Sequence, residues 1–148
     1  MSVNQNFKAF NLLIINTVRD LVAKIEELKG FGKKIGFTPT MGALHLGHAS
    51  LMKRSMDENT ISIVSVFVNP KQFNSSSDLE KYPRTIEKDI AFLEKLGVDL
   101  VFIPTVDDLY SADFTAPTID LGRLELLMEG KMRPGHFDGV VHVLTRLF

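Results

Sequence analysis

Residues 61–68 read Ile-Ser-Ile-Val-Ser-Val-Phe-Val, and this stretch decides the fold class. Apart from its two serines, every residue is β-branched or aromatic, so neither side of a strand formed here would be polar. A strand that is apolar on both sides is typical of the middle of a parallel sheet, where helices cover both faces. The stretch therefore predicts a buried central strand in an α/β protein.

Strand and helix signals alternate on both sides of this central strand. The apolar spacing predicts further strands over 12–15, 34–38 and 98–103, and helices over 17–28, 47–56, 83–96 and 137–148. Thr17 is expected to cap the first helix and Gly97 to end the third. Pro39 is expected to break the second strand, and residues 75–77 to form only a short loop. This alternation predicts an open parallel sheet with right-handed crossovers and helices on both faces.

Length and charge limit the possible functions. The 148 residues leave room for one compact domain. Seventeen Lys and Arg against eighteen Asp and Glu give a net charge of −1, so we expect no nucleic-acid partner. No apolar run is long enough to predict a membrane span, and we expect no secretion signal. The lack of cysteine excludes disulfides and suits a reducing compartment, so we expect a cytoplasmic location.

The two ends of the chain differ in character. Residues 1–11 are expected to be a flexible extension, and the domain to cover 12–148. From Phe137 to Phe148, apolar side chains fall on one helical stripe with no capping residue after them. We therefore expect a domain that is incomplete at its C-terminal end.

Ligands of open parallel sheets bind beyond the carboxyl ends of the strands, so the loops that follow strands are the candidate sites. Three loops qualify, at residues 39–48, 69–73 and 104–110. Chain direction alone places all three at one edge of the sheet. We expect the candidate site to lie at that edge.

The loop at 39–48 leads into a predicted helix and carries two histidines. His45 and His48 are three residues apart, so both imidazoles can face one way, and Gly47 lets a ligand approach the backbone closely. A helix start favours phosphate, and imidazoles there can donate hydrogen bonds to the charge that develops when a nucleotide is attacked at its α-phosphate. The alternative is that both histidines are ordinary surface residues without a function. The strand–turn–helix order around them disfavours this alternative.

Other polar residues in or near these loops could hold a small substrate. The amides of Asn69 and Gln72 suit a neutral or carboxylate-bearing molecule, although an Asn-Pro turn with a solvated Gln is the commoner case. Arg133 could clamp a carboxylate beside His136, or both could be exposed. Two further candidates, each with a structural alternative, are Tyr82 at a helix start and Glu129, which could hold the Arg133 guanidinium.

Three stretches together resemble a known family. Residues 36–51 (GFTPTMGALHLGHASL) resemble the nucleotide-binding signature of the pantoate–β-alanine ligases, relatives of the His-Ile-Gly-His nucleotidyltransferases and class I aminoacyl-tRNA synthetases. Further matches are VSVFVNPKQF with DLEKYPRT, and EGKMRPGHFDGV with VLTRLF. They follow the family's order and spacing over most of residues 12–148. The resemblance implies a Rossmann-like sheet of the His-x-Gly-His nucleotidyltransferase type and a nucleotide-binding domain.

The resemblance also implies a reaction and its site residues. ATP and (R)-pantoate would give an enzyme-held pantoyl adenylate and pyrophosphate, and the amine of β-alanine would then displace AMP to give pantothenate. Magnesium would accompany the ATP, and the full-length enzyme would be a homodimer. His48 would be the proton donor, and Gln72 would hold pantoate and then help to position β-alanine. The ATP site would be lined by Met41, Gly42, Ala43, Leu44, His45, Leu46, Gly47 and His48. The remaining substrate contacts would be Pro39, Asn69, Tyr82, Glu129, Arg133 and His136.

The family pattern continues beyond residue 148. Its further parts are a Gly-x-Lys-Asp segment whose lysine contacts the ATP phosphates, a Ser-Ser-Arg-Asn-like loop and a small C-terminal domain. We therefore expect little or no synthetase activity from this polypeptide alone.

Alternative functions are not excluded by the residues alone. A related adenylyltransferase acting on a phosphorylated cofactor precursor would need more Lys and Arg in the substrate loops. A non-catalytic nucleotide-binding or oligomerisation fragment would keep the His-x-x-His loop as a vestige. A dinucleotide oxidoreductase is disfavoured, because no Gly-x-Gly-x-x-Gly follows any predicted strand.

Overall fold

The computed structural model describes residues 11–110, 114, 115, 117–123 and 127–148, with the backbone but not the side chains of 128 and 129. The expected flexible extension, residues 1–11, lies outside the described residues except for Asn11.

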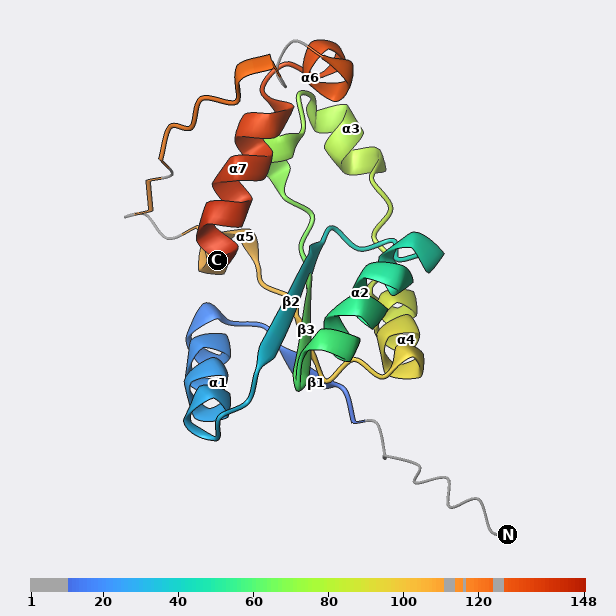
Figure 1. The fold of residues 1–148 in the computed structure, drawn as a ribbon. Helices are drawn as coiled ribbons and strands as arrows, with labels where there is room; N and C mark the ends of the chain where they lie inside the picture. Colours follow the sequence, from blue (N-terminus) through green and yellow to red (C-terminus); the bar gives the residue numbers. More distant parts are fainter. Residues whose placement is uncertain (1–10, 111–113, 116, 124–126) are drawn as a thin grey trace, which may run out of the picture.

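Four parallel strands form the sheet, as predicted. They are β1 (Leu13–Ile15), β2 (Ile35–Thr40), β3 (Ile61–Val66) and β4 (Leu100–Phe102). Their order is β1-β4-β3-β2, so β3, which residues 61–66 form, lies inside the sheet (Figure 1). Ile63 pairs with Phe37 on one side and with Leu100 on the other.

Helices cover both faces of the sheet, and side chains of β3 alternate between the two cores. Ile63 and Phe67 pack with α1 (Val18–Gly30) and α7 (His136–Leu147), through Leu21 and Val143. The opposite core joins Val64 and Val66 to α2 (Leu46–Glu58) and α4 (Ile86–Leu96), through Met52 and Leu93. The sheet is therefore apolar on both sides, which is the reason that its central strand lacks a polar face.

Pro39 does not break β2, contrary to the prediction. The strand continues to Thr40, whose carbonyl oxygen accepts the Phe67 N–H at 3.0 Å. In a parallel pair, alternate residues direct their backbone groups to opposite sides, so position 39 faces away from β3. Among the described strands β2 lies at the edge of the sheet, where the missing N–H of a proline leaves no ladder bond unmade.

The described residues also form four short elements that were not predicted. They are the 3₁₀ turn η1 (Pro70–Gln72) and the helices α3 (Ser76–Lys81), α5 (Val106–Leu109) and α6 (Met128–Met132). Residues 75–77 are thus not only a loop, because the Ser75 side chain caps α3 by accepting the Asp78 N–H at 3.2 Å. α4 begins at Ile86, so Pro83 lies before the helix and not in its first turn.

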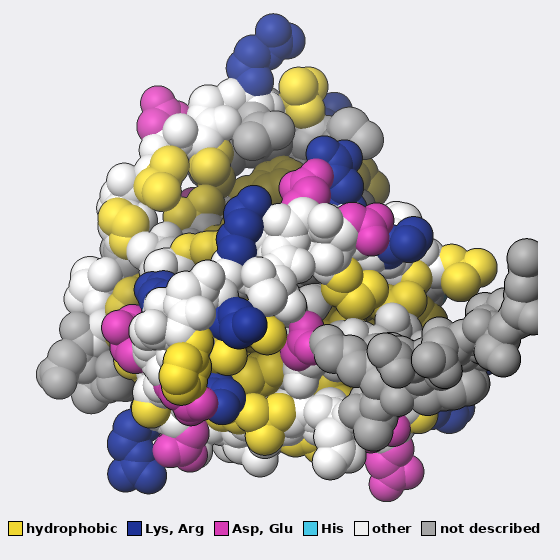
Figure 2. Space-filling model, turned by 60° about the horizontal axis from the view of Figure 1, so that its bottom comes forward, with side chains coloured by type: hydrophobic (Ala, Val, Ile, Leu, Met, Phe, Trp, Pro, Cys, Tyr) yellow, Lys and Arg dark blue, Asp and Glu magenta, His cyan; other side chains and the backbone are white. Residues whose placement is uncertain are grey.

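The predicted helix ends at Thr17 and Gly97 are confirmed. The Thr17 hydroxyl accepts the Asp20 N–H at 3.1 Å, and Gly97 ends α4 with a φ of 89°, a backbone conformation that favours glycine. None of the described helices is long and apolar enough to cross a membrane. On the face seen in Figure 2, basic and acidic side chains are interspersed.

Candidate active site

The carboxyl ends of the strands meet at one edge of the sheet, where α3, α6 and α7 also lie (Figure 1). The three loops singled out in the sequence leave the sheet here because all of its strands are parallel. This edge is the place where open α/β sheets bind ligands.

Two histidines cap the amino-terminal end of α2. Nδ1 of His45 accepts the Gly47 N–H at 3.0 Å, and Nδ1 of His48 accepts the His45 N–H at 3.3 Å. The two rings lie 4.1 Å apart, centroid to centroid. Because both Nδ1 atoms accept, the neutral rings carry their protons on Nε2. Each imidazole therefore presents one N–H donor away from its own backbone.

His48 is half-buried and held in the neutral form. Burial lowers the pKa of His48, the neighbouring His45 acts in the same direction, and the carboxylate of Asp89 acts against both. Protonating Nδ1 would also break the bond to the His45 N–H. His48 is therefore suited to donating a hydrogen bond from Nε2 at neutral pH.

A cavity of about 290 Å³ brings five of the predicted site residues together. They are Pro39, Met41, His48, Gln72 and Tyr82. The wall comes from segment 39–48, from segment 67–82 after β3, and from α7, whose part is apolar: Val140, Val143, Leu144 and Leu147. The geometry thus joins the start of α2 to the 3₁₀ turn after β3, two segments that the sequence separates by more than twenty residues.

Gln72 is nearly buried and is fixed through its backbone. Its carbonyl oxygen accepts a hydrogen bond from Arg133 at 3.3 Å and one from Nδ1 of His136 at 3.0 Å. Since a carbonyl only accepts, His136 carries its proton on Nδ1. The hydrogen bonds that Gln72 makes within the described part of the chain involve its backbone, and only 8% of the residue is exposed. Gln72 lines the cavity, so its side-chain amide is a candidate contact for a ligand.

Arg133 and His136 are not among the residues that line this cavity, and their expected contact with substrate stays a prediction. They lie behind Gln72 and hold its carbonyl, and the Arg133 guanidinium also lies 5.8 Å from the centre of the Phe73 ring. Glu129 belongs to α6, but its side chain lies outside the described part of the chain.

Asn69 is held by partners within the protein, and its expected contact with substrate stays a prediction. It is fully buried, and its Nδ2 donates to the Gly139 carbonyl at 2.9 Å. Its Oδ1 accepts from the Tyr110 hydroxyl at 2.8 Å and from the Lys71 N–H at 3.2 Å. Burial raises the pKa of Tyr110 to about 12, so this hydroxyl remains a donor. Asn69 therefore ties the end of β3 to α7.

Gly139 and Asp89 are site residues that the sequence reasoning missed. A Cβ at position 139 would collide with the Lys71 backbone carbonyl, so only glycine lets α7 pack against η1. Asp89 is buried under the loop at 42–44 and accepts two of its backbone N–H groups. One signal was available for Asp89: it falls on the apolar stripe of its helix, four residues before the buried Leu93.

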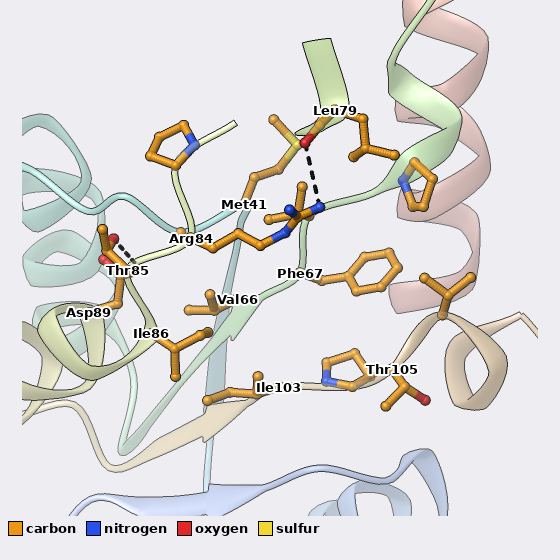
Figure 3. Close-up of a pocket in the computed structure, with 16 residues that line it drawn as sticks. Met41, Val66, Phe67, Leu79, Arg84, Thr85, Ile86, Asp89, Ile103 and Thr105 are labelled. Carbon is orange, nitrogen blue, oxygen red and sulfur yellow. Dashed lines mark hydrogen bonds between the residues drawn. The ribbon is translucent and has the colours of Figure 1, made fainter. Parts of the chain in front are cut away.

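A second cavity, of about 440 Å³, lies beyond the ends of β3 and β4 (Figure 3). Its wall includes Val66, Phe67, Ile86 and Ile103, and the Arg84 side chain extends across it toward the Leu79 carbonyl oxygen. Met41 borders both cavities. None of the other predicted site residues except Gly42 contributes to this second wall.

The described residues do not form a metal site of their own. They contain no group of three or more His, Cys, Asp or Glu side chains that could hold an ion. The Asp89 carboxylate accepts backbone N–H groups with both of its oxygens.

Comparison with known proteins now decides the family. A family model described as pantoate-beta-alanine ligase matches residues 13–148. The chain belongs to the pantoate–β-alanine ligase family. Two relatives named pantothenate synthetase are similar over 135 residues: that of Staphylococcus haemolyticus is 51% identical and that of Bacteroides fragilis 50% identical. The match covers 91% of this chain and 47% or 48% of the relatives, so the chain spans about half their length.

Solved structures of the family share the fold. The pantothenate synthetase of Thermus thermophilus superposes with a TM-score of 0.82 at 44% identity, covering 93% of this chain and 48% of its own. The Francisella tularensis pantoate-beta-alanine ligase, solved in complex with beta-gamma ATP and beta-alanine, gives 0.84 at 40% identity, covering 93% and 52%. The expected Rossmann-like nucleotidyltransferase fold is thereby confirmed.

Proposed function

We propose that these residues serve the ATP-dependent condensation of (R)-pantoate with β-alanine to pantothenate, through a pantoyl adenylate. ATP and pantoate would give the adenylate and pyrophosphate, and β-alanine would then release AMP. The observation that carries this proposal is the shared cavity of His48 and Gln72 at the start of α2. Family membership supports the same reaction.

In the proposed first step, a carboxylate oxygen of pantoate attacks the α-phosphorus of ATP, and pyrophosphate leaves from the opposite side. Negative charge builds up on the phosphoryl oxygens during this attack. The amino end of α2 and the Nε2–H of His48 would stabilise that charge, because both offer N–H donors without rearrangement. Met41 through His48 would line the nucleotide.

Gln72 is proposed to orient pantoate. Its side-chain amide can donate to the hydroxyl or carboxylate oxygens of this acid. Arg133 and His136 fix the residue by hydrogen bonds to its backbone carbonyl oxygen. The two methyl groups of pantoate would lie against the apolar α7 wall of the cavity. Pro39 and Tyr82 would complete the pocket. In the second step the amine of β-alanine attacks the acyl carbon, the acyl–phosphate bond breaks, and AMP leaves.

Further features of the proposed enzyme follow from the family resemblance. Magnesium would arrive with ATP, the enzyme would be a cytoplasmic homodimer, and its partners would be the small substrates alone. We infer that this chain by itself forms little pantothenate, because it spans about half the length of its relatives.

A chimeric enzyme tests the proposed reaction. Residues 12–148 would replace the matching residues of the Staphylococcus haemolyticus relative, with which they share 51% identity. The chimera should form pantothenate and AMP from pantoate, β-alanine and ATP, and the 148-residue chain alone should not. A folded chimera that lacks pantoate-dependent exchange of pyrophosphate into ATP would contradict the proposal, as would equal exchange after His48→Asn in the chimera.

A further inference from the structure

Asp89, in the first turn of α4, is a buried carboxylate that accepts two hydrogen bonds from the loop before α2. Only 3% of the residue is exposed. Oδ2 accepts the Ala43 N–H at 3.0 Å, and Oδ1 accepts the Leu44 N–H at 2.8 Å. The Thr85 hydroxyl donates to Oδ2 at 3.2 Å, a bond that Figure 3 marks beside the second cavity. A buried carboxylate is tolerated where N–H and O–H donors satisfy it in this way.

The loop that Asp89 holds has an unfavourable backbone conformation. Gly42 has a φ of 79°, and Ala43, which has a side chain, has a φ of 50°. Residues with side chains adopt such angles only where their surroundings impose them. Gly42 and the Asp89 carboxylate also lie close together, because a Cβ at position 42 would be 2.9 Å from Oδ2 of Asp89. The carboxylate therefore binds the turn at the place where its backbone angles are unfavourable.

The strained turn leads directly into the phosphate-favouring end of α2. Leu44 is followed by His45, the residue that caps the helix, and the His45 N–H in turn holds the His48 ring. A shift of the two N–H groups bound by Asp89 would move both imidazoles. Asp89 thus connects α4 to the donors that face the His48–Gln72 cavity.

We propose that Asp89 is a positioning residue of the nucleotide site: by holding the backbone of Ala43 and Leu44, its carboxylate fixes the direction in which the amino end of α2 and the His48 ring face the ligand. That the ligand is ATP rests on the proposed function. The claim that Asp89 holds the loop does not depend on that function. Asp89 itself contacts no reacting atom in this scheme.

The neighbouring Glu87 provides a matched control. Both carboxylates lie in the first turn of α4, where either one interacts favourably with the positive end of the helix dipole. Glu87 is exposed, whereas Asp89 is buried against the loop. Glu87→Gln therefore removes the same charge from the same helix turn and leaves the loop untouched. Asp89→Asn keeps the size of the side chain but places an NH₂ group against one of the two backbone N–H donors.

The test uses the ¹⁵N-labelled 148-residue chain and two measurements. In Asp89→Asn, hydrogen exchange of the Ala43 and Leu44 amides should accelerate roughly tenfold or more, while exchange in β3 changes little. Calorimetry should show ATP affinity reduced roughly ten- to hundredfold. Glu87→Gln should leave both measurements within about twofold of the unaltered chain.

A second variant covers the case in which Asp89→Asn does not fold. Thr85→Val removes only the hydroxyl that donates to Oδ2, and it should give a smaller change of the same sign in both measurements. Unchanged loop exchange and ATP affinity in a folded Asp89→Asn chain, or in Thr85→Val, would overturn the proposal. If the unaltered chain bound no ATP, the ATP-binding role proposed for the half-length chain would be refuted, and the exchange data would still decide whether Asp89 holds the loop.

Discussion

Replacing Gly139 by alanine tests how the Gln72 side of the cavity is built. The added Cβ would meet the backbone of Lys71 and Gln72, which cannot move aside as a side chain could. α7 would have to shift away from η1, and the buried bond from Asn69 to the Gly139 carbonyl would be strained or lost. The same substitution also improves helix propensity, so the two effects oppose each other.

The opposing effects can be weighed. A lost buried hydrogen bond costs about 1–3 kcal/mol. Overpacking costs about 1–3 kcal/mol, and the gain in helix propensity is about 1 kcal/mol. Gly139→Ala should therefore lower the free energy of unfolding by about 3 kcal/mol and the melting temperature by roughly 6–12 °C.

Gly30→Ala is the matched control, because Gly30 also lies in a helix and a Cβ there would have no neighbour within 4 Å. This variant should be unchanged or more stable by up to about 1 kcal/mol. Urea denaturation of both variants, followed by circular dichroism, measures the difference. Gly139→Ala with a stability equal to that of Gly30→Ala would refute the argument that α7 packs too closely on η1 for any side chain.

Three further predictions concern single ionisable or hydrogen-bonding groups. His48→Asn keeps an acceptor in the place of Nδ1 and removes the Nε2–H, so ATP affinity measured by calorimetry should fall roughly tenfold. His48→Gln loses the acceptor that caps the helix instead, so it should mainly lower the free energy of unfolding, by about 1 kcal/mol. A larger loss of ATP affinity in His48→Gln than in His48→Asn would contradict the roles assigned to the two nitrogens. Because the pKa of His48 is lowered on folding, the folded state binds its proton less well than the unfolded state, so stability should fall as the pH drops below 6.5 toward the folded pKa, and NMR titration should place that pKa below 6.5. The pKa of Tyr110 is raised to about 12, so its contribution to stability should be present below pH 10 and lost as the pH rises toward 12; ultraviolet titration showing that hydroxyl ionising near 10 would contradict its burial against Asn69.

The fold was predictable because its signals are local. Residues 61–68 show their burial through composition alone, and Thr17 and Gly97 mark helix ends through their own side chains or backbone. The short helices were missed because they have too few residues for a period to emerge, and Pro39 was misjudged because its tolerance depends on the edge position of β2.

The location of the candidate site was predictable because parallel strands bring their following loops to one edge of the sheet. The role of a side chain was not predictable where its hydrogen-bond partners are distant in the sequence. Parallel strands sufficed to bring His48 and Gln72 toward one edge. The partners that hold the Asn69 side chain lie 41 and 70 positions away, so no local pattern in the sequence could show them. Asp89 stood out as an acid on an apolar stripe, but its contacts with Ala43 and Leu44, 46 and 45 positions earlier, needed the structure.

The central claim is that the start of α2 and the Gln72 cavity form one nucleotide and acid site. NMR titration of the 148-residue chain, first with ATP and then with pantoate, tests it most directly. We predict that ATP shifts the backbone amides of residues 41–48 and the ring nitrogens of His48, and that pantoate then shifts the side-chain amide of Gln72. Shifts from ATP confined to other surfaces, or a Gln72 amide that ignores pantoate while His48 responds to ATP, would contradict the account.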